Sequence, residues 1–460
     1  MTRYIISFII ALGLIIFTGC SGVKNLTPVS LDTPTELVDG HRDSTTIADM
    51  EWWEFYTDPS LQVIITKMLD NNRDLMMASA KINELREMYG VAKAGMLPTV
   101  SALASADHET NDYYDKKHVD DPEFDLKATV NWEYNILGAQ NWSKKKAGAQ
   151  YLASIDAQRA LRMSLIAETA TAYFNLIALD NELSIVKRTL ATRKEGVEQA
   201  KLRFEGGLTS ETVFQQAKVE YASTAALIPD IERRLNIARN ALTLLMGEFP
   251  TEEIERSQLN INQRMPNELP IGLPSTLMKR RPDIHASEQR LKAALAEVGY
   301  TYADQFPSFR ISFSGGFEND DLGHLLASPF TYVIGTLTGN VFDFKRKNKR
   351  YKASVAAYEQ ARLTYEKDVI TAFTEVNNAV SSYKNVHETA IRRSELRDAS
   401  LKYVELAHLQ YRAGSLAYLD VLDAQRRYFD AQVGLSNAIC DEYIALVNLY
   451  KVLGGGWQQK

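Results

Sequence analysis

Two carboxylates, Asp420 and Asp423, lie three residues apart in the stretch YRAGSLAYLDVLDAQRRYFDAQ, residues 411–432. On a helix this spacing places both side chains on one face, where they could hold a cation or exchange a proton. His285 with Glu288 is a second arrangement capable of proton transfer. Neither pair is accompanied by an HExxH, GxSxG or P-loop motif, and the seven histidines are scattered along the chain. The sequence therefore predicts a protein that is not an enzyme and has no metal site or cofactor.

The acidic pair belongs to a helical hairpin that the chain carries twice. The stretch FEGGLTSETVFQQAKVEYASTA, residues 204–225, aligns with 411–432 and places Gly207 on Gly414. Farther from these glycines, Pro98 aligns with Pro307 at almost the same shift. A nearly constant shift over so long a stretch indicates two structurally equivalent halves.

Each half is expected to contain a helix, two strands, a long helix, a turn and a shorter helix. We assign the halves to residues 59–247 and 276–454, with an inter-repeat segment at 248–275 and a tail at 455–460. The strands are expected at about 98–137 and 307–343, and the turns near Gly207 and Gly414. Four further ranges are predicted to be helical: 143–204 and 345–413 as long rods, and about 60–93 and 209–246 as shorter helices. The last of these has a coiled-coil seam from Ile231 to Leu245.

The stretch FDLKATVNWEYNI, residues 124–136, alternates apolar and polar side chains along its whole length. Trp132 and Tyr134 lie near one end, as expected for a strand with lipid on one face and water on the other. A half-buried strand of a soluble protein gives the same alternation. If the strands do face lipid, four of them cannot close on themselves, and several chains must pool their strands.

The composition excludes some partners. The chain has 460 residues, a formal net charge of −6 and 45% apolar residues, which argues against nucleic-acid binding because phosphates require a basic face. The N-terminal stretch MTRYIISFIIALGLIIFTGCS has Arg3, an apolar core and small residues before Cys20, and reads as an export signal at 1–19. It resembles a bacterial lipoprotein signal, with Phe17 where Leu is usual, so that Cys20 would be lipidated and 20–58 would follow as a lipidated N-terminal segment. An ordinary secretory signal with a chance cysteine is the alternative.

Several stretches together resemble the TolC-like outer membrane factors, in particular the lipoprotein branch that serves resistance-nodulation-division (RND) efflux systems, often labelled NodT-like. They are WWEFYTDPSLQVIITKMLDNN near the start, LPIGLPSTLMKRRPDIHASEQRL opening the second half, the repeated hairpin, and the ending VLGGGW. The resemblance covers essentially all of the mature chain.

The resemblance implies a mainly α fold with a small β part: duplicated long coiled-coil hairpins and four antiparallel strands per chain. Three chains would form a homotrimer with a shared 12-stranded outer-membrane β-barrel, continued by an α-helical periplasmic tunnel. The chain would be lipid-anchored in the cell outer membrane, with a periplasmic extension. It would work as a passive exit duct with a periplasmic adaptor protein and an inner-membrane RND pump as partners.

The resemblance also assigns roles to residues at the hairpin turns. Asp420 and Asp423 match the acidic ring that narrows the tunnel entrance, where crowded carboxylates raise pKa values and favour cations. Tyr411 matches a tyrosine that holds the tips closed through hydrogen bonds, and Thr212 adjoins its partner position in the first half. The candidate adaptor contacts are the turn residues Gly206, Gly207, Leu208, Thr209, Gly414, Ser415 and Leu416.

The family's latch does not transfer intact. Val213 and Leu416 occupy the positions of its charged partners, so a weaker or rearranged latch is expected, for which Arg203 or Arg412 could substitute. Two other functions remain open: an exit duct of type I protein secretion, which shares this architecture, and a lipidated periplasmic adaptor, which would normally have one hairpin. The transported substrate is not specified by the sequence.

Overall fold

A computed structural model describes residues 46–111, 114, 119–135, 137–250, 253–260, 265–266, 269–272, 274–340 and 342–457. The signal peptide and Cys20 lie outside these residues. The chain forms two compact units, and each takes segments from both halves of the sequence. The described part of the first unit comprises 80–155 and 286–367, and that of the second comprises 46–79, 156–285 and 368–457.

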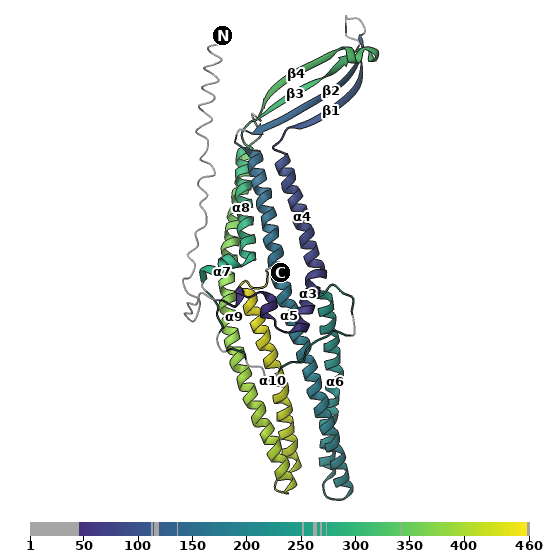
Figure 1. Ribbon diagram of the computed structural model, residues 1–460, viewed down its shortest axis with the longest axis vertical. Coiled ribbons are helices and arrows are strands. Elements are labelled where there is room, and N and C mark those ends of the chain that lie inside the picture. The colour runs from purple at the N-terminus through teal and green to yellow at the C-terminus, as the bar shows by residue number, and fades with distance from the viewer. Residues whose placement is uncertain are drawn as a thin grey trace. The chain divides into compact units, whose positions relative to one another are not determined.

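The first unit contains one antiparallel sheet of four strands, in the order β1-β2-β3-β4. The strands are β1 (Thr99–Asn111), β2 (Val119–Asn135), β3 (Ser308–Asn319) and β4 (Pro329–Thr338), with the 3-10 helix η2 (Leu322–Ala327) between the last two. Figure 1 shows them as one curved layer. The two strands of each sequence half are neighbours, and the β2–β3 pairing joins the halves. The expectation of two strands per half is confirmed.

The register sorts the side chains of the sheet by polarity. Val130 lies opposite Phe313, and Trp132 lies opposite Ile311, so apolar residues share one face. On the other face Thr129 pairs with Ser314, and their hydroxyl oxygens are 2.9 Å apart. Because successive side chains of a strand point to opposite faces, the alternation of β2 and β3 gives one apolar and one polar face. From the edge strands, Leu103, Tyr332 and Ile334 also lie on the face of Thr129 and Ser314.

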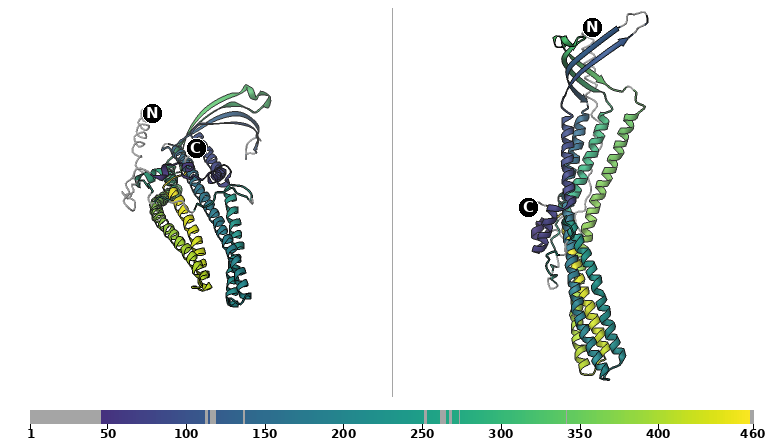
Figure 2. Two further views of the ribbon diagram at one scale, coloured as in Figure 1. Left: turned by 60° about the horizontal axis from the view of Figure 1, so that its bottom comes forward. Right: turned by 90° about the vertical axis from the view of Figure 1, so that its right-hand side faces the viewer.

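The second unit is built around two helical hairpins of equal size, visible in Figures 1 and 2. The first consists of α5 (Ala139–Glu205) and α6 (Glu211–Leu245), and the second of α9 (Arg346–Arg412) and α10 (Tyr418–Val452). The long helices have 67 residues each and the shorter ones 35 each, as a duplicated unit requires. Both long helices begin in the first unit. The heptad seam predicted on α6 is buried at Ile231, Leu235 and Leu242.

The remaining helices are shorter. They are η1 (Ile47–Asp49), α2 (Trp52–Phe55), α3 (Pro59–Asn71), α4 (Arg73–Ala94), α7 (Pro274–Arg280) and α8 (Pro282–Ala303). The single helix expected at about 60–93 is therefore two helices. None of the described helices has an apolar stretch long and uncharged enough to cross a bilayer.

Asn72 accounts for the break between α3 and α4. Its side-chain oxygen accepts hydrogen bonds from the backbone N–H groups of Asp74 (3.0 Å) and Leu75 (3.2 Å), which caps α4. Its side-chain nitrogen donates to the carbonyl of Leu245, the last residue of α6, at 2.8 Å. One asparagine thus begins a helix and joins it to the end of another.

Candidate functional site

The two hairpin turns have the same backbone geometry. Gly207 has φ +71° and Gly414 has φ +76°, in the left-handed region that favours glycine. In the first turn, the N–H of Leu208 donates to the carbonyl of Arg203 at 2.8 Å. In the second turn, Ser415 donates to Gln410 at 3.0 Å in the equivalent bond. Both long helices therefore end in the same glycine-dependent cap.

The turn residues predicted to contact an adaptor are mostly open to solvent. Gly206, Gly207, Gly414 and Ser415 are exposed, and the side chain of Leu208 is 72% exposed. Leu416 differs, because it is half-buried against Ala407, Val421 and Ala424. A large apolar side chain left open at a turn is available for contact with another protein.

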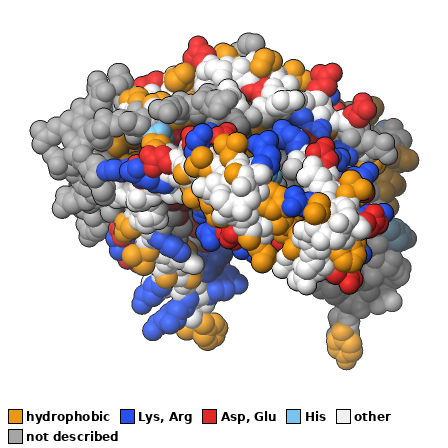
Figure 3. Space-filling model, turned by 90° about the horizontal axis from the view of Figure 1, so that it is seen from below, with side chains coloured by type: hydrophobic (Ala, Val, Ile, Leu, Met, Phe, Trp, Pro, Cys, Tyr) orange, Lys and Arg blue, Asp and Glu red, His pale blue; other side chains and the backbone are white. Residues whose placement is uncertain are grey.

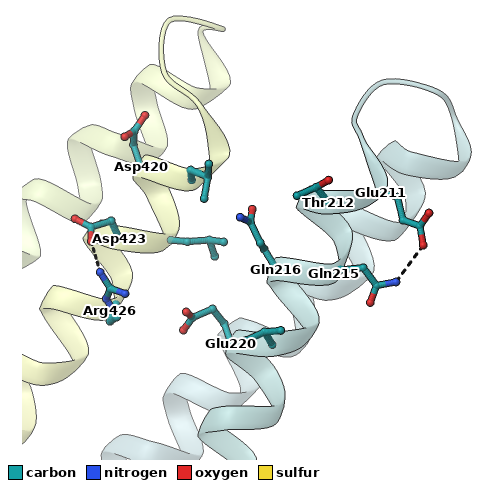
Figure 4. A pocket seen from close by; sticks show the side chains of 11 residues that line it. Glu211, Thr212, Gln215, Gln216, Glu220, Asp420, Asp423 and Arg426 are labelled. Carbon is teal, nitrogen blue, oxygen red and sulfur yellow. Dashed lines mark hydrogen bonds and ion pairs between the residues drawn. The ribbon is translucent and has the colours of Figure 1, made fainter.

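A groove of about 810 Å³ lies between the first turns of α6 and α10. We call it the tip groove. Figure 4 shows its polar lining, in which side chains of α6 face side chains of α10. The lining includes Thr212, Gln216 and Glu220 from α6 and Asp420, Asp423 and Arg426 from α10. Three of the residues predicted to form the gate, Thr212, Asp420 and Asp423, thus share one groove.

The two aspartates of the tip groove differ in electrostatic environment. The Asp423 carboxylate accepts hydrogen bonds from Arg426 (2.6 Å) and Arg427 (2.7 Å), one helical turn along α10. The hydrogen bond from Arg427 is the main cause that lowers the pKa of Asp423, and Arg426 adds to it. Within one chain, Asp423 is therefore a paired carboxylate. Asp420 is exposed and has no ion pair among the described residues.

Glu220, on the α6 side of the groove, leads to a buried arginine that the sequence analysis missed. Its carboxylate lies 3.0 Å from a guanidinium nitrogen of Arg193, which is 8% exposed. Arg193 also donates to the backbone carbonyl of Glu220 at 2.9 Å and to the hydroxyl of Thr224. Its guanidinium lies over the ring of Phe429, 5.6 Å from the centroid. Arg193 on α5 thus contacts α6 and α10, which belong to different hairpins.

Tyr411 lies outside the tip groove. Its ring packs on the buried cluster of Ala407, Val421 and Ala424 within its own hairpin. The guanidinium of Arg203, from the other hairpin, lies over this ring at 5.3 Å from the centroid. No hydrogen bond of the Tyr411 hydroxyl is present among the described residues. The other arginine considered from the sequence, Arg412, donates to the His408 carbonyl of its own helix at 3.4 Å.

Tyr418 makes a third contact between the two hairpins. Its hydroxyl lies so close to Gly196 of α5 that a Cβ atom there would be 3.1 Å away. Burial raises the pKa of Tyr418. The centroid of its ring lies 5.4 Å from that of the neighbouring Tyr411 ring. A larger residue at position 196 would require the Tyr418 hydroxyl to move.

The described residues contain no cluster of three or more His, Cys, Asp or Glu side chains that could hold a metal ion. The tip groove is lined by carboxylate, amide, hydroxyl and arginine side chains together with Val219, Leu419 and Leu422.

Comparison with known proteins places this geometry in a family. The model of the family described as "Outer membrane efflux protein" matches residues 64–248 and 273–455. The toluene efflux pump outer membrane protein TtgC of Pseudomonas putida is 29% identical, over 100% of this chain and 97% of TtgC. The cation efflux system protein CusC of Escherichia coli is 27% identical, over 99% of each chain.

The solved structure of the outer-membrane channel OprN superposes with a TM-score of 0.86 at 28% identity, covering 94% of this chain and 99% of OprN. The fold and the family expected from the sequence are confirmed. This chain belongs to the outer membrane efflux protein family, together with the outer-membrane channels and pump components to which it is similar.

Proposed function

We propose that this chain forms the exit channel of a tripartite, RND-type efflux system, as a homotrimer in the outer membrane. Three copies would give twelve strands that close into one barrel, and their hairpins would line a tunnel into the periplasm. The duct would be passive, so that an inner-membrane pump and a periplasmic adaptor choose and deliver the cargo.

The sheet carries this proposal. Its β2–β3 pair has one apolar face around Val130, Trp132, Ile311 and Phe313, and among the described strands β1 and β4 each pair along one edge only. An unpaired strand edge in lipid leaves backbone N–H and C=O groups unsatisfied, at several kcal/mol each. Pairing β1 of one copy with β4 of the next satisfies both edges. This requirement distinguishes a channel from an adaptor, which needs no closed sheet.

The helices support association in the same way. Large apolar side chains remain exposed along α9, including Leu363 (51%), Ile370 (63%) and Leu409 (55%). Apolar side chains open along a long helix favour burial against a neighbouring helix. The names of the relatives fit a passive duct. TtgC is named for a toluene efflux pump and CusC for a cation efflux system, although both align with nearly the whole of this chain.

Two further features belong to this proposal. Lipid attached at Cys20 would tether each chain to the inner leaflet of the outer membrane. The turns at Gly207 and Gly414 would be the periplasmic ends of the duct, where the tip groove and Leu208 are open to an adaptor.

The test is the single-channel conductance of the purified mature protein in a planar bilayer, with and without divalent cations. We expect small, cation-selective openings that divalent cations block. A folded trimer that inserts and never conducts would overturn the channel proposal. The secretion alternative is tested by adding a secreted polypeptide in place of a small cargo. A block of the current by the polypeptide would favour that alternative.

A further inference from the structure

The chain has a dense group of cations where β4 leads into α9. Lys345, Arg346, Lys349, Arg350 and Lys352 lie within eight residues, and all five are exposed. In the part of the chain that the structure describes, none of the five forms an ion pair with a carboxylate. On the face drawn in Figure 3, Lys and Arg side chains gather beside apolar ones at the lower left. We call these five residues, with Phe342 and Phe344, the α9 basic patch.

Helix stability does not account for these cations. Arg346 is the first residue of α9, and its first turn contains no acidic residue. The N-terminus of a helix carries partial positive charge, so that cations there are unfavourable and anions are favourable. The nearby carboxylate of Asp343 is already engaged, because it accepts a hydrogen bond from the Lys347 N–H at 2.9 Å. The five charges are therefore available to an anion from outside the chain.

Two aromatic side chains adjoin the cations and are open to solvent. Phe342 is 75% exposed and Phe344 is 85% exposed, and their rings contact each other with centroids 4.6 Å apart. Phe344 and Lys345 have φ values of 53° and 65°, in the left-handed region that such residues rarely adopt. A strained backbone that holds an apolar ring in the open indicates a contact made outside the chain.

The equivalent point of the first half has a related composition. After β2, the start of α5 contains Trp142 followed by Lys144, Lys145 and Lys146. Lys145 lies over the Trp142 ring at 4.4 Å, and Lys146 is paired with Glu297 at 2.9 Å. Both halves thus place cations and an aromatic side chain directly after a strand of the sheet.

We propose that the α9 basic patch binds the phosphate groups of anionic phospholipids, with Phe342 and Phe344 inserted among the acyl chains. Lys and Arg beside exposed aromatic side chains are typical of segments that lie in a membrane interface. This inference rests on the proposed function, which puts the sheet in the outer membrane and the start of α9 at its periplasmic leaflet.

The test compares lipid retained by the full mature trimer after reconstitution into nanodiscs of equal amounts of phosphatidylglycerol and phosphatidylethanolamine. Lipids that remain bound after extraction into detergent are measured by mass spectrometry. We expect phosphatidylglycerol to be enriched at least about five-fold over the bulk ratio, since each cation near an anionic surface contributes a comparable factor. High salt should lower this enrichment.

The patch variant changes Lys345, Arg346, Lys349, Arg350 and Lys352 to Gln. The matched control changes five exposed cations outside the patch, all in the second unit, to Gln: Lys187, Arg188, Lys194, Lys201 and Lys218. Loss of enrichment in the patch variant alone supports the inference. A second variant, Phe342→Ser with Phe344→Ser, should lose part of the enrichment while all five charges remain.

Two outcomes would overturn the inference. Equal enrichment in the patch variant, in a trimer that still conducts, would reject lipid binding and leave the channel intact. A changed ion selectivity with unchanged lipid retention would show that these cations face the duct. Failure of the wild-type trimer to insert or conduct would instead reject the proposed function, and the lipid inference with it.

Discussion

The guanidinium of Arg203, near the end of α5, lies over the ring of Tyr411, near the end of α9, with 5.3 Å from guanidinium carbon to ring centroid. This contact joins the two hairpins at their turns. It occupies the place where the family resemblance implied hydrogen bonds to charged groups, which Val213 and Leu416 cannot form. We propose that this contact between a cation and an aromatic face serves as the latch of this chain, in which case the latch depends on the ring and not on the hydroxyl.

This relationship predicts different results for three substitutions. Arg203→Ala and Tyr411→Leu should each raise the open probability, by a factor of about two to five per chain, because an exposed cation–π contact contributes about 0.5–1 kcal/mol. Tyr411→Phe keeps the ring and should leave the open probability unchanged. Single-channel recording checks all three, with Arg412→Ala as the matched control. An increase for Tyr411→Phe equal to that for Tyr411→Leu would assign the latch to the hydroxyl.

The two aspartates of the tip groove should not be equivalent. Asp420 has no ion pair in the described chain, whereas Asp423 is held by Arg426 and Arg427. Asp420→Asn should therefore remove more of the divalent-cation block than Asp423→Asn, which removes a carboxylate that is already paired. The variant Arg426→Gln with Arg427→Gln, which frees the Asp423 carboxylate, should strengthen the block.

The pH dependence of the block separates the two carboxylates further. Because Arg427 and Arg426 lower the pKa of Asp423, this carboxylate stays ionised to a lower pH than an unpaired aspartate. Any block that persists in Asp420→Asn should thus survive mild acidification, as measured by conductance titrated with calcium at several pH values. Equal blocks for Asp420→Asn and Asp423→Asn would contradict the assignment.

A buried acid between α9 and α10 predicts a second dependence on pH. Glu442 is 4% exposed, and its carboxylate is 2.5 Å from the Nδ1 atom of His387. Burial raises the pKa of Glu442, although His387 opposes this. The folded protein then binds a proton more tightly than the unfolded chain, so its stability falls as pH rises through the folded-state pKa.

Glu442→Gln should remove that dependence, because an amide does not titrate. The thermal unfolding midpoint of the wild type should fall relative to Glu442→Gln between mildly acidic and mildly alkaline buffer. Glu388→Gln, an exposed substitution on α9, is the control and should parallel the wild type. If the unfolding midpoints of Glu442→Gln and the wild type change with pH in parallel, Glu442 has the same pKa in the folded and unfolded states.

The periodic parts of this fold could be predicted from the sequence, because repetition constrains them. The shift that superposes Gly207 on Gly414 leads directly to two equal hairpins with the same cap, and the alternation in β2 fixes which side chains share a face. Asn72 could not be predicted to divide a helix. Its side chain also bonds to Leu245, which is distant in the sequence, and an isolated asparagine inside a helical pattern is a weak signal.

The candidate site was only partly predictable for a similar reason. Sequence spacing put Asp420 and Asp423 on one face but could not show which of them Arg426 and Arg427 would pair with. Arg193 was missed because a charged residue on a long helix usually remains in solvent, and its partners lie on two other helices. A polar residue at a position of the buried face was the available signal.

Cys440 offers a test of the lipidation proposed at Cys20. The chain has two cysteines, and Cys440 is buried, with its pKa raised to about 12 by burial. A thiol with so high a pKa is almost entirely protonated at neutral pH and reacts slowly. The folded, mature protein should therefore show almost no thiol reactive with Ellman's reagent.

Unfolding then distinguishes the two fates of Cys20. If its thiol carries lipid, the denatured chain should expose one reactive thiol, and denatured Cys440→Ala should expose none. If the export signal is an ordinary one that leaves Cys20 unmodified, denatured wild type should release two and Cys440→Ala one. A thiol that reacts rapidly in the folded protein and persists in Cys440→Ala would belong to an unmodified Cys20 and would reject the lipid anchor.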